Sequence, residues 1–195
     1  MKTIGVLLAG GESRRYGSPK AFAMLNSKPF YQHSLTCLKA FTNKQLIISH
    51  PNLVLNFQQN GHKNIYTDKE PYQGLGPLAG IFSAMAYGES DWYVIAPCDT
   101  PYLEATIYKK LIEKLFQQDT EYDAVIPLVN DKRQPLIGLY HRRTKPFIQQ
   151  LLDERTLKVG ALFQRVNTLF VEDSMFDKDP QSFLNINHIH DKPKE

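Results

Sequence analysis

Short apolar runs alternate with longer segments in which apolar residues recur at helical spacing. The run at residues 4–8 is short, continuous and followed by glycines, which is typical of a buried strand. Similar runs predict strands at residues 45–49, 64–67, 92–96, 123–128, 136–140 and 167–171. The segments between them predict helices at residues 29–41, 78–87, 106–116, 145–152 and 159–166.

This alternation predicts an α/β fold, with a mostly parallel twisted sheet and helices on both of its faces. The chain has 195 residues and a hydrophobic content of 42%, enough for a core without disulfides. We therefore expect a single domain over residues 1–195, with a polar tail from about residue 188 that frays. Ligands bind beyond the carboxyl ends of the strands in open α/β sheets, so those ends are where a site is expected.

Charge and cysteine usage exclude several classes of function. The net charge is +3 with basic residues spread along the chain, so we expect no nucleic-acid partner. Cys37 and Cys98 form neither a CxxC pair nor a zinc spacing, and we expect both to be small buried apolar residues. The apolar run at residues 4–9 is too short to cross a membrane and lacks the layout of a signal peptide. These features predict a cytoplasmic protein without membrane contact.

The first predicted strand leads directly into a glycine-rich basic loop, residues 8–20. Gly10 and Gly11 let the backbone approach a ligand closely, and their N–H groups can cradle phosphate oxygens. Arg15 and Lys20 would add charge-assisted hydrogen bonds. The spacing matches neither a Walker A loop nor the dinucleotide-binding fingerprint. The loop predicts a triphosphate site, and the alternative is a basic surface turn.

A second glycine-rich turn, residues 74–80, opens a predicted helix. Pro77 suits the first helical turn, and the free N–H groups beside Gly76 suit an anion or the edge of a nucleobase. The alternative is a plain turn before a closely packed helix. Asp68, which follows the third predicted strand, is a weaker candidate for a nucleotide or metal contact, and a turn-forming role is equally open there.

Asp99 follows the buried run at residues 92–96 and stands between two prolines, so it is held rigidly at the tip of a strand. Mg²⁺ prefers one or two carboxylates together with substrate phosphates, which makes Asp99 the natural metal ligand. The alternative is that Asp99 caps the helix that follows. The six histidines form no zinc-like pair, and no Ser/His/Asp arrangement is indicated.

Five motifs resemble those of one known family, the molybdenum cofactor guanylyltransferases. The loop at 8–20 (LAGG-x-S-x-R-x-G-x-x-K) resembles the general nucleotidyltransferase signature. The more specific matches are GPLAG at 76–80, CDTP at 98–101, QPL followed by GLY at 134–140, and FLNIN at 183–187. The matches occur in order and cover roughly residues 4–187.

The resemblance implies a Rossmann-like nucleotidyltransferase fold and transfer of GMP from GTP to molybdopterin. The terminal phosphate of molybdopterin would attack the α-phosphorus of GTP, and pyrophosphate would leave. Arg15, Lys20 and Asp99 would be catalytic, Asn185 and Asn187 would hold molybdopterin, and Asp99 would carry Mg²⁺, with Mn²⁺ as the alternative. The expected GTP contacts are Leu8, Ala9, Gly10, Gly11, Lys20, Asp68, Gly76, Pro77 and Asp99. Transient contact with molybdoenzymes or other cofactor-biosynthesis proteins would accompany this role.

The sequence departs from the family pattern at several positions. Tyr16 replaces a methionine, Pro19 stands where many relatives have aspartate, and His188 follows the second asparagine where relatives often continue Thr-Pro. An asparagine that often follows the second strand has no clear counterpart, although Ser49 and Asn52 are nearby. That leaves the contact expected there open.

Three rival functions share these features. The cytidylyltransferase that modifies the same pterin usually has LAAG in its first loop, where this chain has LAGG. Sugar-phosphate nucleotidyltransferases are usually longer. A non-catalytic nucleotide-binding regulator would have no need to retain Arg15, Lys20 and Asp99 together.

Overall fold

The computed structural model describes residues 2–11, 19–176 and 180–186. Its main sheet has eight strands in the order β10-β7-β9-β6-β1-β4-β5, with β8 paired to β7, and β2 and β3 form a separate hairpin. The strands are β1 (Thr3–Ala9), β2 (Met24–Leu25), β3 (Lys28–Pro29), β4 (Lys44–Ser49), β5 (Ile65–Tyr66), β6 (Trp92–Pro97), β7 (Ala124–Val129), β8 (Lys132–Arg133), β9 (Gly138–His141) and β10 (Thr168–Glu172).

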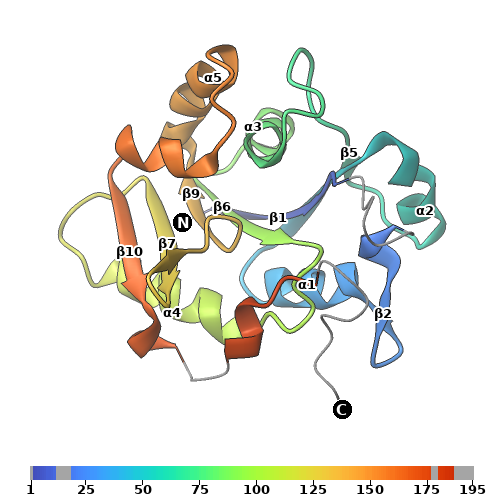
Figure 1. Ribbon diagram of the computed structural model, residues 1–195, viewed down its shortest axis with the longest axis horizontal. Coiled ribbons are helices and arrows are strands. Elements are labelled where there is room, and N and C mark those ends of the chain that lie inside the picture. Colours follow the sequence, from blue (N-terminus) through green and yellow to red (C-terminus); the bar gives the residue numbers. More distant parts are fainter. Residues whose placement is uncertain (1, 12–18, 177–179, 187–195) are drawn as a thin grey trace.

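The helices lie on both faces of this sheet (Figure 1). The α-helices are α1 (Phe30–Lys39), α2 (Val54–Gln59), α3 (Pro77–Tyr87), α4 (Ala105–Phe116) and α5 (Lys145–Asp153). The 3-10 helices are η1 (Lys20–Phe22), η2 (Pro51–Leu53), η3 (Arg142–Thr144), η4 (Val159–Gln164), η5 (Asp173–Met175) and η6 (Pro180–Phe183). No helix in the described part of the chain is both long and apolar enough to span a bilayer.

The sheet is mostly parallel, as its sequence pattern predicts. β1 pairs in parallel with β4 and β6, β4 with β5, and β7 with β10. β9 is the exception, because it lies antiparallel between β6 and β7. It spans Gly138–His141, so the strand expected at residues 136–140 begins two residues later.

Two apolar layers sandwich the sheet. Leu7 faces the core beneath α1 and α4, whereas Ile4 and Val6 face the core beneath α3 and α5. All six residues of β6 are buried, because this central strand is covered on both faces. A continuous apolar run is what such a strand requires, which is why the sequence predicted it.

The sequence pattern did not predict the shortest elements correctly. The helix expected at residues 159–166 is the shorter 3-10 helix η4, and α2 was not predicted at all. The hairpin β2–β3 turns at Asn26 and Ser27, which both have positive φ values, 47° and 58°. A two-residue turn of this kind favours asparagine or glycine, but strands of two residues carry too little periodicity to be recognised.

Candidate functional site

The carboxyl ends of β1 and β6 bring Lys20 and Asp99 together. The backbone N–H of Cys98 donates to the carbonyl of Leu8 at 3.1 Å, which fixes the loop after β6 beside the end of β1. Lys20 opens η1, and its Nζ lies 2.8 Å from Oδ2 of Asp99 across 79 residues of sequence. The two side chains are only 14% and 22% exposed. Their attraction is therefore less screened by water than that of a surface pair.

The structure does not make Asp99 a helix cap. α4 begins at Ala105, and the residue in the capping position is Glu104. The alternative interpretation of Asp99 from the sequence is therefore wrong, and its carboxylate is engaged by Lys20 instead. Two of the predicted site residues, Arg15 and Asn187, lie outside the described residues.

Gly10 and Gly11 directly follow β1, the strand that ends beside this ion pair. Both glycines are exposed, and a Cβ atom added to either would meet no atom within 4 Å. Neither has the positive φ that favours glycine. Local packing and backbone conformation therefore give no reason for glycine here, whereas close approach of a ligand to the backbone does. Ala9 is buried, and its carbonyl accepts the N–H of His50 at 3.0 Å.

Asp68 closes the second glycine-rich turn from the end of β5. Its Oδ2 accepts the backbone N–H of Gly74 at 3.0 Å. Gly74 and Gly76 have φ values of 70° and 78°, so the conformation of the turn requires glycine at both positions. Burial raises the pKa of Asp68, and the hydrogen bond from Gly74 partly offsets that rise. Pro77 begins α3, as expected.

Gly80 joins the two loops. A Cβ atom on Gly80 would lie 2.9 Å from Cδ2 of Leu8 and 3.9 Å from Oδ1 of Asp68. The first turn of α3 therefore packs directly on the end of β1, and a larger residue at position 80 would push Leu8 away. This contact brings Leu8, Asp68 and the start of α3 to one edge of the sheet.

The C-terminal segment after η6 reaches the same edge. The N–H of Ile186 donates to the carbonyl of Asp99 at 2.9 Å, and Oγ1 of Thr100 donates to Oδ1 of Asn185 at 2.6 Å. Ile186 is buried against Phe30, the first residue of α1. Asn185, although 85 residues away from Thr100 in sequence, thus lies beside the predicted metal ligand. Sequence reasoning missed Thr100, whose hydroxyl carries no distinctive signal.

His50 occupies the position after β4 where the sequence left a contact open. Ser49 is buried, and its hydroxyl donates to the carbonyl of His50 at 2.9 Å. His50 is half-buried, and its Nδ1 accepts the N–H of Asn52 at 3.3 Å. Of the two residues considered from the sequence, Ser49 therefore serves the local backbone, and His50 is the side chain beside this strand end that was missed.

The donor set suits a metal that arrives with a nucleotide. Within residues 2–11, 19–176 and 180–186, no group of three or more His, Cys, Asp or Glu side chains is placed to hold a metal ion. Asp99 offers one carboxylate, and Mg²⁺ typically takes one or two carboxylates plus substrate phosphates. Cys37 is buried as expected, with a pKa raised to about 11 by burial, and Cys98 is half-buried. Neither is part of a metal cluster among the described residues.

Comparison with known proteins identifies the family of this chain. Residues 5–168 match the model of the MobA-like NTP transferase domain. The probable molybdenum cofactor guanylyltransferase of Halalkalibacterium halodurans is 50% identical over 188 residues, covering 96% of this chain and 94% of that protein. A protein of the same name from Bacillus licheniformis is 38% identical over 98% of this chain and 95% of its own length.

A solved structure confirms the fold. The crystal structure of molybdopterin-guanine dinucleotide biosynthesis protein A from Archaeoglobus fulgidus superposes with a TM-score of 0.79 at 22% identity. The match covers 96% of this chain and 94% of that chain, so the Rossmann-like architecture is shared along nearly the whole length. Together with the two relatives and the family model, this shows that the chain belongs to the MobA-like NTP transferase family.

Proposed function

We propose that this chain is a molybdenum cofactor guanylyltransferase, which transfers GMP from GTP to the terminal phosphate of molybdopterin and releases pyrophosphate. The names of the two relatives support this activity. The observation that carries it is the contact between Lys20 and Asp99 at the edge of the sheet where β1 leads into the exposed Gly10 and Gly11. A cation, a carboxylate and exposed backbone at one edge of a parallel sheet match what a nucleoside triphosphate requires.

In this proposal the protein catalyses by positioning and by neutralising charge. Nucleotidyl transfer needs no nucleophilic side chain, since the attacking oxygen belongs to molybdopterin. An oxygen of its phosphate forms a bond to the α-phosphorus of GTP, while the bond from that phosphorus to the bridging oxygen of pyrophosphate breaks. Lys20 neutralises charge on the phosphates, joined in the proposal by Arg15 of the same loop.

The proposed GTP site extends along three strand ends. The phosphate side in the proposal is the end of β1 and the residues that follow it, namely Leu8, Ala9, Gly10 and Gly11. Asp68, Gly76 and Pro77 line the nucleoside side, because Gly80 draws α3 against Leu8. Asp99, at the end of β6, would hold Mg²⁺ or Mn²⁺, and a bound divalent cation stabilises the negative charge of the phosphates during transfer.

Molybdopterin is proposed to bind where the C-terminal segment with Asn185 meets the loop that carries Asp99. Asn185 belongs to the segment that the Ile186–Asp99 backbone hydrogen bond joins to the loop after β6, and Asn187, outside the described residues, is its partner in the proposal. Amide side chains there supply both donors and acceptors to a pterin edge or its phosphate. Asn185 already accepts a hydrogen bond from Thr100, which fixes the orientation of its amide.

One experiment tests the activity and its rivals together. The purified protein is incubated with Mg²⁺, molybdopterin and each of the four nucleoside triphosphates separately, and the pterin dinucleotide is identified by mass spectrometry. We expect the guanine dinucleotide and pyrophosphate from GTP. A cytosine dinucleotide from CTP would indicate the related cytidylyltransferase instead. GTP binding without any product would support a nucleotide-binding regulator and contradict the proposal.

A further inference from the structure

The segment between β5 and α3 contributes a single buried side chain to the core. The structure describes all of residues 67–76, and Tyr72 is the only residue among them that is buried, with 6% of its surface exposed. Leu75 is half-buried, and Gly74 and Gly76, the glycines that begin the second glycine-rich turn, are exposed. Tyr72 is therefore the main side-chain anchor of this turn.

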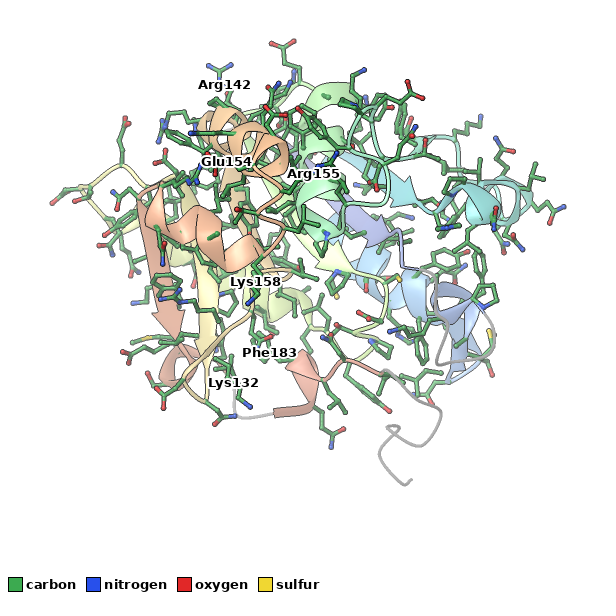
Figure 2. All side chains as sticks on the ribbon, turned by 45° about the horizontal axis from the view of Figure 1, so that its top comes forward. Lys132, Arg142, Glu154, Arg155, Lys158 and Phe183 are labelled. Atoms are coloured by element: carbon green, nitrogen blue, oxygen red, sulfur yellow. The ribbon has the colours of Figure 1, made fainter. Side chains whose placement is uncertain are left out.

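The side chain of Tyr72 contacts both helices on that face of the sheet. Its ring meets Phe82 of α3 edge-on, with the ring centres 5.0 Å apart. Its hydroxyl donates to Oδ1 of Asp153, the last residue of α5, at 2.6 Å across 81 residues of sequence. α3 and α5 lie side by side (Figure 1), and Figure 2 shows Glu154 and Arg155, which directly follow Asp153, where α5 ends. One hydroxyl thus fastens the turn to a helix from a distant part of the chain.

The backbone of Tyr72 carries this restraint to the glycines. Its N–H donates to the carbonyl of Lys69 at 2.9 Å, and its carbonyl accepts the N–H of Leu75 at 3.2 Å. The N–H of Gly74 donates to the carboxylate of Asp68 at 3.0 Å. Tyr72 therefore lies at the centre of the hydrogen bonds that shape the turn, directly before the residues proposed to meet the nucleoside.

Two glycines make the turn dependent on such an anchor. Glycine has access to more backbone conformations than any other residue, so ordering a turn that contains two of them is costly in entropy. The N–H of Lys69 donates to the hydroxyl of Ser83 on α3, which fixes the start of the segment but not the glycines. A ligand that meets a turn already in place does not have to supply this ordering cost.

We propose that Tyr72 is a positioning residue that, through its hydrogen bond to Asp153, holds the second glycine-rich turn in the conformation that accepts the nucleoside of GTP. The inference rests on the proposed function, in which this turn lines the nucleoside side of the site. Tyr72 acts through the turn, because its hydroxyl is engaged by Asp153 and not by substrate. When fewer molecules keep the turn ordered, the apparent Kd of every ligand that uses it rises by the same factor.

Amide hydrogen exchange tests the anchor directly and requires no substrate. Tyr72→Phe keeps the ring and removes only the hydroxyl. We expect the amides of Gly74 and Leu75, which are both hydrogen-bonded in the wild type, to exchange several-fold faster in this variant. Tyr93→Phe is the matched control, because it removes another buried hydroxyl, which donates to the carbonyl of Gly88 at the other end of α3. Exchange at Gly74 and Leu75 should be unchanged in the control.

Calorimetric titration and steady-state kinetics test the consequence for nucleotides. Tyr72→Phe should weaken GTP and GMP binding by the same factor, about tenfold, comparable with the loss of one hydrogen bond to a charged group. The Kd of inorganic tripolyphosphate, which has no nucleoside, should not change. KM for GTP should rise while kcat stays close to that of the wild type, since the groups at Asp99 are unaltered.

Variants of Asp153 show whether the two side chains act as one unit. Asp153→Ala should weaken GTP binding as much as Tyr72→Phe does, and the double variant should be no worse than either. Asp153→Asn keeps an acceptor oxygen, so it should retain most of the affinity. Tyr93→Phe should bind GTP like the wild type.

Four results would overturn the assignment, and one of them would also remove the proposed function. Unchanged exchange at Gly74 and Leu75 in Tyr72→Phe would mean that the hydroxyl does not order the turn. A lower Tm with unchanged GTP affinity would show that the hydrogen bond only stabilises the fold. A larger loss for GTP than for GMP would place the effect at the phosphates. Absence of saturable GTP binding in the wild type, seen before any variant is compared, would contradict the proposed function and this inference with it.

Discussion

The two ends of β6 differ in how their polar groups are satisfied. At the carboxyl end, Asp99 pairs with Lys20, and Thr100 bonds to Asn185, so partners come from distant parts of the chain. At the amino end, within the described ranges, the hydroxyl of Ser90 has no hydrogen-bond partner and Arg142 forms no ion pair within 4.0 Å, while the backbone N–H of Lys2, helped by Arg142, lowers the pKa of the Asp91 carboxyl. The strand between them is uniformly buried. Burial of apolar side chains therefore explains why β6 forms, whereas the arrangement of polar groups at its two ends depends on contacts with other segments.

The comparison shows that side chains from distant parts of the chain hold one another at the carboxyl end and not at the amino end. Groups held by mutual contacts need little reorganisation when a substrate arrives, which is what charge stabilisation in catalysis requires. A buried hydroxyl without a partner keeps the cost of its desolvation and contributes no such organisation. Changing one partner at the assembled end should therefore damage activity most, whereas equivalent changes at the other end should not affect it.

The largest effect is expected for Asp99→Asn. The amide keeps the shape of the side chain but loses the charge that faces Lys20 and, in our proposal, the metal. Turnover should fall by at least on the order of 100-fold, comparable with the loss of one key stabilising group. Asp91→Asn at the amino end of the same strand is the matched control, and its turnover should stay close to that of the wild type. Near-normal turnover of Asp99→Asn with Mg²⁺ present would contradict the metal role.

How well this end was predicted depended on the kind of signal each residue carries. Asp99 follows a continuous apolar run, and Lys20 belongs to a loop that directly follows another, so both were identified from the sequence. Their contact across 79 residues follows from strand order, which periodicity does not reveal. Thr100 and His50 were missed because a single hydroxyl or imidazole after a strand has many structural uses.

The glycines show a different limit of sequence reasoning. Gly10 and Gly11 were interpreted as a means of approaching a ligand, whereas the turn with Gly74 and Gly76 was left open between an anion or nucleobase site and a plain turn. The structure separates them, since Gly74 and Gly76 have positive φ values that the turn itself requires. Gly10 and Gly11 have neither positive φ nor close neighbours. The sequence alone does not show whether a glycine is required for a positive φ value or to leave room beside the backbone.

Lys20→Ala should have the next largest effect, on nucleotide affinity. A charge-assisted hydrogen bond contributes about 1.5–3 kcal/mol, so GTP should bind roughly 10-fold to 150-fold more weakly. GMP, which lacks the β- and γ-phosphates, should lose less. Calorimetric titration of both nucleotides checks this, with Lys109→Ala on α4 as the control. Unchanged GTP affinity would mean that the loop at residues 8–20 is a surface turn.

Asp68→Asn should separate affinity from stability. Its amide oxygen can still accept the N–H of Gly74, so the turn should persist. Because burial raises the pKa of Asp68, the carboxyl favours the folded state below its usual pKa and loses that contribution as pH rises through the folded value. At pH 7 the variant should therefore have an equal or higher Tm, and the difference should vanish in strong acid. GTP affinity should fall about tenfold, the worth of one hydrogen bond to a charged group.

Thermal scans at several pH values and a GTP titration together check this prediction. Ser83 of α3, whose hydroxyl accepts the N–H of Lys69 next to Asp68, provides the matched comparison. Ser83→Ala removes the hydrogen bond to the backbone beside Asp68 without changing charge, so it should lower Tm at every pH. A pH-independent loss of stability in Asp68→Asn would mean that Asp68 acts only by shaping the turn.

The smallest effect is expected for Asn185→Ala. Its amide accepts one hydrogen bond, from the hydroxyl of Thr100, and such a neutral bond contributes about 1 kcal/mol. The segment should stay in place, because Ile186 remains buried against Phe30 and its N–H still bonds to Asp99. We therefore expect kcat/KM for molybdopterin to fall about fivefold, with GTP affinity nearly unchanged.

Thr100→Val removes the other half of the same hydrogen bond and shows what Asn185 does. If Asn185 serves only to hold the loop after β6, both variants should reduce kcat/KM equally, and the double variant should be no worse than either. If the amide also contacts molybdopterin, Asn185→Ala should be the more damaging change, because the substrate loses a partner as well. A loss of GTP affinity as large as the loss of kcat/KM would place the effect at Asp99. That result would remove the asparagine from the proposed molybdopterin site.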